Sequence, residues 1–235
     1  MKSEEYAAVR VVVNCCLACL LTFWGTLQAA ADLTFSQTAV GFPIVGAGSN
    51  AVFVVSANDA EVVTTVARCV IQDIKAVTGK QLTLANSNIL NSKFKMGGQG
   101  TLPEGEQEGG LDASYPIIAG TIGQSAIIDA LIADGKVDTT GLTGVWEAYA
   151  LQLVSNPMEG VGQALVIMGS TPRGTAYGLF EISRCIGVSP YVWWADVEPA
   201  PMSCIYVQGD RTDVEKPSVQ YRGLFINDED WAMLP

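Results

Sequence analysis

Histidine is absent from the 235 residues of this chain. Without an imidazole, the printed residues form neither a Ser-His-Asp nor a Cys-His catalytic arrangement, and they offer no zinc site that requires histidine. Carboxylates are then the acid and base groups that remain near neutral pH. Any acid–base chemistry carried by these residues must therefore use Asp or Glu.

Basic residues and cysteines are also scarce. The chain has 13 Lys and Arg against 24 Asp and Glu, for a net charge of −11. Such an acidic surface repels phosphate backbones, which argues against a nucleic-acid partner. Three of the six cysteines lie in the first 31 residues, and Cys69, Cys185 and Cys204 lack C-x-x-C spacing. We therefore expect at most one disulfide, no cofactor and no sulfur-bound metal.

The first 31 residues are expected to be a secretory signal. A short charged start precedes the almost wholly apolar stretch 11–27, and three alanines at 29–31 are typical of a cleavage site. Cleavage after Ala31 would remove two basic and two acidic residues, so the net charge of −11 would not change. We expect a secreted or periplasmic protein without a stable membrane span after cleavage. The alternative is a membrane anchor formed by an uncleaved leader, because the apolar stretch is long.

The remaining chain alternates between helical and extended patterns. Apolar residues spaced three and four apart predict a helix that begins after a cap at Asn58 or Asp59 and stops at Gly79, and helices over 125–133 and 172–186. Apolar runs bounded by turn residues predict strands over 33–36, 42–45, 51–55, 81–84, 116–119, 146–154 and 164–168. Apolar residues make up 49% of the chain, which is enough for a sizeable core. The fold class is therefore predicted as α/β, with a mixed sheet flanked by helices over residues 32–190.

Two stretches interrupt this alternation. Asn, Ser, Gly and Glu dominate 86–114, which is predicted to be a surface insertion. Three prolines and little periodicity mark 191–218, which is predicted to be a linker leading to a strand within 219–235.

That last strand ends in a run of polar groups. The sequence YRGLFI at 221–226 delivers Asn227, Asp228, Glu229 and Asp230 in succession. Glycoside hydrolysis uses a pair of carboxyl groups, and neighbouring acids push each other's pKa values apart. Asp228 and Glu229 are therefore candidates for an active site, although such clusters also occur as helix caps or solvated loops.

A second candidate is Arg173, in the segment GSTPRGTAYG at 169–178. Pro172 suits the first position of a helix, which places Arg173 in the first turn, where the helix dipole disfavours a cation. An anion would reverse this penalty. We expect Arg173 to face a uronate carboxylate or an acidic side chain of a following domain, with a structural ion pair or solvent exposure as the alternative.

Taken together, these segments resemble glycoside hydrolase family 115, the xylan α-1,2-glucuronidases. The resemblance spans nearly all of the chain after the leader. It is most specific in YRGLFINDED at 221–230, and it is supported by GVWEAY at 144–149, GS at 169–170, RGT at 173–175, EIS at 181–183, IGVSP at 186–190 and WWADV at 193–197. One departure is Thr171-Pro172, where the family more usually has Asp followed by a variable residue.

The resemblance implies an accessory α/β domain of the type that precedes hexosaminidase barrels, followed by a (β/α)₈ barrel. On that mapping 222–226 is the first barrel strand, and Asn227, Asp228 and Glu229 lie at its mouth, where barrel active sites form. The implied activity is removal of (4-O-methyl)glucuronic acid from glucuronoxylan with inversion and without a metal. Asn227 and Arg173 would bind substrate, and a homo-oligomer of the full-length protein is left open.

The sequence also predicts what the chain does alone. An inverting pair lies roughly 6.5–9.5 Å apart across the sugar, so adjacent residues of one strand do not supply both members. The principal acid and base are expected on later strands, and this N-terminal portion is expected to be inactive alone. The alternatives are a stand-alone module that binds carbohydrate or a partner protein, and part of a hexosaminidase-like or family 67 hydrolase.

Overall fold

The computed structural model describes residues 31–87, 115–192 and 197–223. The N-terminal half supplies β1 (Thr34–Ser36), β2 (Phe42–Val45), β3 (Val52–Ser56), α2 (Glu61–Thr78) and β4 (Thr83–Ser87). The C-terminal half supplies β5 (Pro116–Thr121), α3 (Ala126–Ala133), β6 (Tyr149–Met158), β7 (Val161–Gly169), α4 (Pro172–Cys185) and β8 (Ile205–Gln208). The predicted mixture of helices and strands is confirmed.

The main sheet has five strands in the order β4-β3-β5-β7-β6. The first four run parallel, and β6 is antiparallel to β7 because a two-residue turn joins them directly. A smaller antiparallel sheet has the order β1-β8-β2. The mixed sheet that the sequence predicts is thus present.

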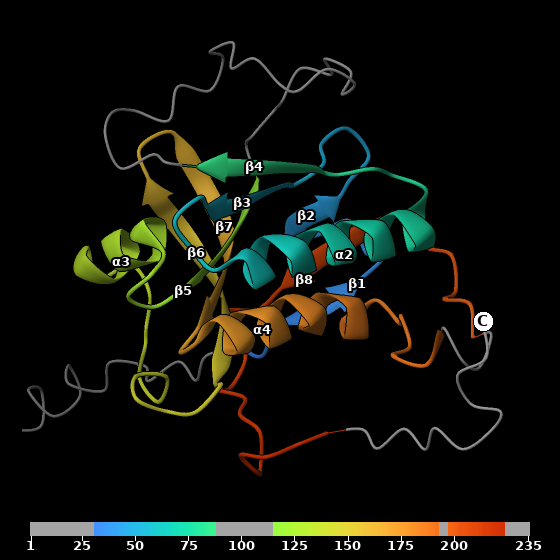
Figure 1. The fold of residues 1–235 in the computed structure, drawn as a ribbon. Coiled ribbons are helices and arrows are strands. Elements are labelled where there is room, and N and C mark those ends of the chain that lie inside the picture. Colours follow the sequence, from blue (N-terminus) through green and yellow to red (C-terminus); the bar gives the residue numbers. More distant parts are fainter. Residues whose placement is uncertain (1–30, 88–114, 193–196, 224–235) are drawn as a thin grey trace, which may run out of the picture. The chain divides into compact units, whose positions relative to one another are not determined.

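Helices cover both faces of the main sheet. On β3, Phe53 and Val55 pack in the cluster that contains α2 and α4, whereas Val52 and Val54 pack in the cluster that contains α3. This alternation is the two-residue period of a strand buried on both faces. Figure 1 shows α2 and α4 side by side on one face of the sheet and α3 on the other.

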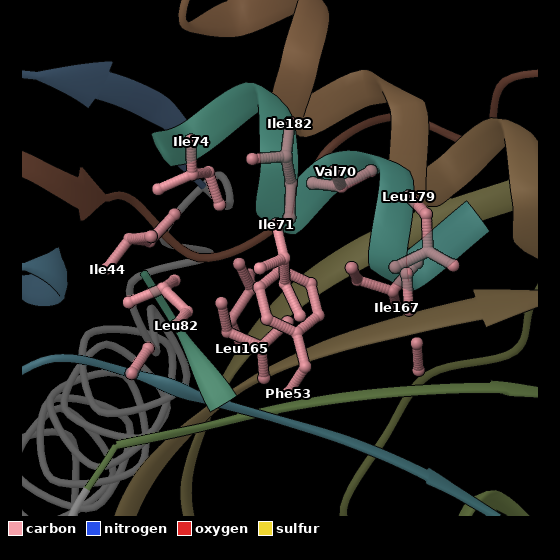
Figure 2. Packing of buried hydrophobic residues seen from close by; sticks show 14 of the residues in the cluster. Ile44, Phe53, Val70, Ile71, Ile74, Leu82, Leu165, Ile167, Leu179 and Ile182 are labelled. Carbon is pink, nitrogen blue, oxygen red and sulfur yellow. The ribbon is translucent and has the colours of Figure 1, made fainter. Parts of the chain in front are cut away.

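The larger cluster holds the molecule together. It packs α2 and α4 against the main sheet (Figure 2). Its members include Ile71 and Ile74 of α2, Leu179 and Ile182 of α4, Phe53 of β3, and Leu165 and Ile167 of β7. At about 1.5–3 kcal/mol for each buried side chain of this size, this face supplies much of the stabilisation of the fold. It is the platform on which α4 is fixed.

The predicted linker at 191–218 needs correction. Ile205–Gln208 forms β8, the central strand of the small sheet, and Ile205 and Val207 are fully buried. Further on, Thr212 and Glu215 donate backbone N–H groups to Leu151 and Tyr149 of β6. These paired stretches are too short to show a clear apolar period, and the prolines around them are typical of a linker. This range is largely part of the α/β domain.

Smaller differences concern ends of elements. The helix predicted from an Asn58 or Asp59 cap has Ala60 as its N-cap, and Asp59 instead accepts hydrogen bonds from two backbone N–H groups, those of Ala60 and Thr121. Residues 221–223 are irregular, so the described part of the predicted barrel strand does not form a strand. In the described ranges, no helix is both long and apolar enough to cross a membrane.

Candidate functional site

Three of the four predicted site residues, Asn227, Asp228 and Glu229, lie outside the described residues. Their assignment as active-site residues stays a prediction. The fourth, Arg173, is described, and it leads to a cluster of charged side chains where α4 begins.

The start of α4 follows from its local sequence. Thr171 is the N-cap, and its hydroxyl accepts a hydrogen bond from the Gly174 N–H at 3.2 Å, as expected of a capping threonine. Pro172 occupies the first turn, where its missing N–H costs nothing. A Cβ on Gly174 would lie 2.5 Å from the carbonyl oxygen of Ala148. Glycine at this position therefore allows the helix to approach the chain just before β6.

Glu147 lies at that point of close approach. Its side chain is only 3% exposed, and its backbone has a φ of 46°, in the left-handed region that few residues other than glycine adopt. Burying a carboxylate requires partners for its charge. Arg173 provides one, with Nη1 3.1 Å from Oε1, and Arg222 provides the other, with Nη2 against Oε2.

Arg222 is held from several sides. Its guanidinium donates to the Tyr177 hydroxyl at 2.9 Å and to the carbonyl oxygen of Val219 at 2.6 Å, and it lies over the Tyr177 ring at 5.6 Å. The hydrogen bond to Tyr177 and the contact with Glu147 raise the pKa of Arg222 above its ordinary value. We call Glu147, Arg173, Tyr177 and Arg222 the Glu147 cluster.

The Glu147 cluster connects three distant parts of the chain. Glu147 precedes β6, Arg173 and Tyr177 belong to the first half of α4, and Arg222 lies 75 positions after Glu147. Both carboxylate oxygens of Glu147 contact guanidinium groups, Oε1 that of Arg173 and Oε2 that of Arg222. Its chemistry suits holding the segments together.

Arg173 lies as predicted in the first turn of α4, but it forms an ion pair within the domain. The structural pairing that we set out as the alternative is therefore present. The side chain of Arg173 is still 63% exposed. The ion pair with Glu147 does not test whether Arg173 also binds a uronate or a following domain, so that binding stays a prediction.

A second charged group lies further along α4. Glu181 accepts a hydrogen bond from Arg184 Nε at 2.8 Å, one from the Tyr149 hydroxyl at 3.3 Å and one from the Cys185 thiol at 3.5 Å. Burial raises the pKa of Glu181, but the contact with Arg184 and the hydrogen bonds from Cys185 and Tyr149 together outweigh it, so the pKa of Glu181 is below its ordinary value. Burial raises the pKa of Cys185 to about 11 and also raises that of Tyr149. We call these four residues the Glu181 cluster.

The carboxyl ends of the parallel strands are where open α/β sheets commonly bind ligands. Here the polar groups satisfy one another. Asp59 accepts from the Thr121 N–H at 2.7 Å, and the Thr121 hydroxyl lies 2.9 Å from that of Thr175. In the described part of the chain, every buried side-chain nitrogen and oxygen has a partner, and no three potential metal ligands gather. The polar groups of Asp59, Thr121 and Thr175 at this edge are therefore engaged with one another.

Glu147 is not among the site residues that the sequence predicts. It belongs to the GVWEAY segment of the family resemblance and to the strand predicted over 146–154, whereas β6 begins at Tyr149. One signal in the sequence points to Glu147: it is a single acid between apolar residues. If such an acid is buried, it needs a cation as a partner. Which arginine supplies that cation depends on contacts across 75 residues, and the spacing of residues in the sequence does not reveal them.

The chain was compared with known proteins. A scan against protein-family models finds no match, and neither does a search of curated proteins. Among solved structures, the chain is similar to a family 115 4-O-methyl-α-glucuronidase with specificity for decorated arabinogalactans, at 32% identity and a TM-score of 0.56. It is also similar to CpGH84D, at 8% identity and a TM-score of 0.35 over 80% of this chain and 24% of the other, which is too low to support an argument.

The match to the glucuronidase covers 81% of this chain and 20% of that enzyme. This chain thus spans about one fifth of the length of the solved relative. At 32% identity over that extent, the match concerns sequence as well as fold. The resemblance of this chain to glycoside hydrolase family 115, which the sequence predicts, is thereby confirmed.

Proposed function

We propose that this chain is the N-terminal accessory portion of a secreted glycoside hydrolase that removes (4-O-methyl)glucuronic acid side chains from glucuronoxylan by inverting hydrolysis. The observation that carries the proposal is the 32% identity to a family 115 glucuronidase over 81% of this chain. The coverage of 20% of that enzyme supports the view that the catalytic machinery lies largely elsewhere. Asn227, Asp228 and Glu229 would contribute to the mouth of the active site.

The described carboxylates fit an accessory role. Hydrolysis with inversion needs one protonated carboxyl group and one free carboxylate on opposite sides of the sugar. Glu147 and Glu181 are instead engaged in ion pairs with arginines. We therefore propose that the 235-residue chain alone does not hydrolyse polysaccharide. Glucuronic acid released above background by the purified chain would contradict this.

The polysaccharide backbone is a separate question. The relative is described as specific for decorated arabinogalactans. This description favours glucuronic acid branches of arabinogalactan as a second candidate substrate. The test is to express the gene product extended beyond Pro235 and to measure release of 4-O-methylglucuronic acid from glucuronoxylan and from arabinogalactan. Proton NMR of the first product anomer then decides between inversion and retention.

The same gene product tests export and the non-catalytic alternative. Processing as proposed gives a mature N-terminus at Asp32, and an uncleaved anchor gives an intact leader in the membrane fraction. Affinity electrophoresis of the 235-residue chain in gels containing each polysaccharide tests binding without hydrolysis. Retardation of a catalytically silent chain, together with an inactive extended product, would favour the stand-alone binding module.

A further inference from the structure

Residues 221–223 are the last that the structure describes, and little backbone structure holds them. They are irregular, and between described residues they make no backbone hydrogen bond. The Tyr221 side chain is 89% exposed. What fixes this stretch to the domain is the side chain of Arg222, through its contacts with Glu147 and Tyr177.

The anchor that receives Arg222 is rigid. Glu147 is buried and pinned by its second partner, Arg173, on the first turn of α4. That turn is itself fixed by the Thr171 cap and by the close approach of Gly174 to Ala148. Arg222 therefore attaches the end of the described chain to the start of α4 and the segment before β6, and it does so five positions before Asn227.

We propose that Glu147 is a positioning residue: by clamping Arg222, it fixes the point and direction in which the chain leaves the α/β domain toward Asn227, Asp228 and Glu229. This inference rests on the proposed function for its catalytic consequence. Active sites lose rate when their groups move by about 1 Å, so an accessory domain can affect catalysis through such a clamp without touching substrate.

The chain offers a control that matches in sequence separation and in the type of substitution. Asp138 and Arg211 form an ion pair 73 positions apart, against 75 for Glu147 and Arg222. Asp138 is 45% exposed, however, and its arginine lies in the segment that covers β6. Asp138→Asn thus makes the same carboxylate-to-amide change in a long-range arginine pair that does not involve Arg222.

The first measurement uses the 235-residue chain and needs no activity. Backbone ¹⁵N order parameters of residues 221–223 should be about 0.8 in the native chain and should fall below about 0.6 in Glu147→Gln and in Arg222→Gln. They should not change in Asp138→Asn. Because Arg222 is partly exposed and Glu147 keeps Arg173 as a partner, Arg222→Gln should disturb the fold less than the buried Glu147→Gln substitution. Order parameters that stay at the native value in a folded Arg222→Gln chain would overturn the clamp.

The second measurement uses the extended enzyme. Arg222→Gln should lower kcat at least tenfold with KM changed less than threefold, whereas Asp138→Asn should leave both within twofold. Loss of stability alone would lower the active fraction, so active-site titration corrects for it. An unchanged kcat per folded molecule in Arg222→Gln would refute the positioning role. An unmutated enzyme without glucuronidase activity would refute the proposed function instead, and the order parameters would still decide the clamp.

Discussion

Glu147 contacts α4 and Glu181 belongs to it, yet the surroundings of the two carboxylates differ. Glu147 is 3% exposed and pairs with Arg173 at the helix start and with Arg222, which is distant in sequence. Glu181 is 12% exposed, and its arginine, Arg184, lies three positions away on the same helix and is 73% exposed. The ion pairs of Glu147 join separate segments, whereas the ion pair of Glu181 joins neighbours on a single helix, to which Tyr149 of β6 adds one hydrogen bond.

This difference indicates where ion pairs matter for architecture. A pair within one helix turn adds only a few tenths of a kcal/mol, because the helix already places both side chains together. A buried carboxylate shared by two distant arginines fixes the relative positions of segments that the backbone does not hold. The loss of one partner also leaves charge uncompensated in a dry environment. We therefore expect substitutions at the two clusters to differ in size and in kind.

The largest effect is expected from Gly169→Ala, which affects both clusters through their common helix. An added Cβ would lie 2.1 Å from the backbone nitrogen of Thr175 and 2.4 Å from its hydroxyl oxygen. Since β7 is fully buried at this point, α4 must move away from the sheet. We expect a loss of about 3 kcal/mol in the free energy of unfolding, measured by urea denaturation. A loss below about 1 kcal/mol would show that α4 adapts freely.

The next effect tests the comparison itself. Glu147→Ala should lower the free energy of unfolding by about 2–3 kcal/mol, because it removes charge-assisted hydrogen bonds from a buried site. Glu181→Ala should cost about 0.5–1 kcal/mol, since its partner is largely solvated. Parallel urea titrations of the two variants provide the measurement. Equal losses would mean that burial and sequence separation do not distinguish the clusters.

Much of the fold was accessible from the sequence because its elements carry strong local signals. The spacing of Val66, Val70 and Ile74 predicts α2, and Thr171 with Pro172 predicts the start of α4. Buried parallel strands are short continuous apolar runs, so β3 and β5 were predicted to within two residues of their ends. Local pattern was sufficient wherever each element had its own start, period and stop.

The remaining features depend on partners that are distant in the sequence. β8 is only four residues long and is a strand because β1 and β2 flank it, which the surrounding prolines do not reveal. The sequence predicts Arg173 as a cation at an unfavourable position, the start of a helix. It does not predict the partner of Arg173, because the contact with Glu147 depends on how β6, β7 and α4 pack. The candidate site was therefore half predictable: its helix end was visible in the sequence, and its acid was not.

A pH dependence sharpens the comparison on the side of Glu181. Its folded-state pKa is lowered, so its stabilising contribution is complete above the ordinary carboxyl value of 4.5 and is lost as the pH falls through the folded value. The stability difference between the native chain and Glu181→Gln should be largest at pH 7 and should shrink as the pH falls below 4.5. Asp73, whose pKa is raised by burial, is present in both chains and cancels. A constant difference from pH 7 to pH 3 would contradict the ion-pair contribution.

The smallest effect concerns the thiol beside Glu181. Burial, more than the charge of Glu181, raises the pKa of Cys185 to about 11, so roughly one thiol in a thousand is ionised at pH 8. Iodoacetamide labelling followed by peptide mapping should modify the exposed Cys69 well before Cys185. Glu181→Gln should speed labelling of Cys185 by no more than about threefold, since it removes the charge but leaves the thiol buried. A tenfold or greater increase would mean that the carboxylate, and not the packing of α4, protects this cysteine, and the Glu181 cluster would then control reactivity as well as local helix stability.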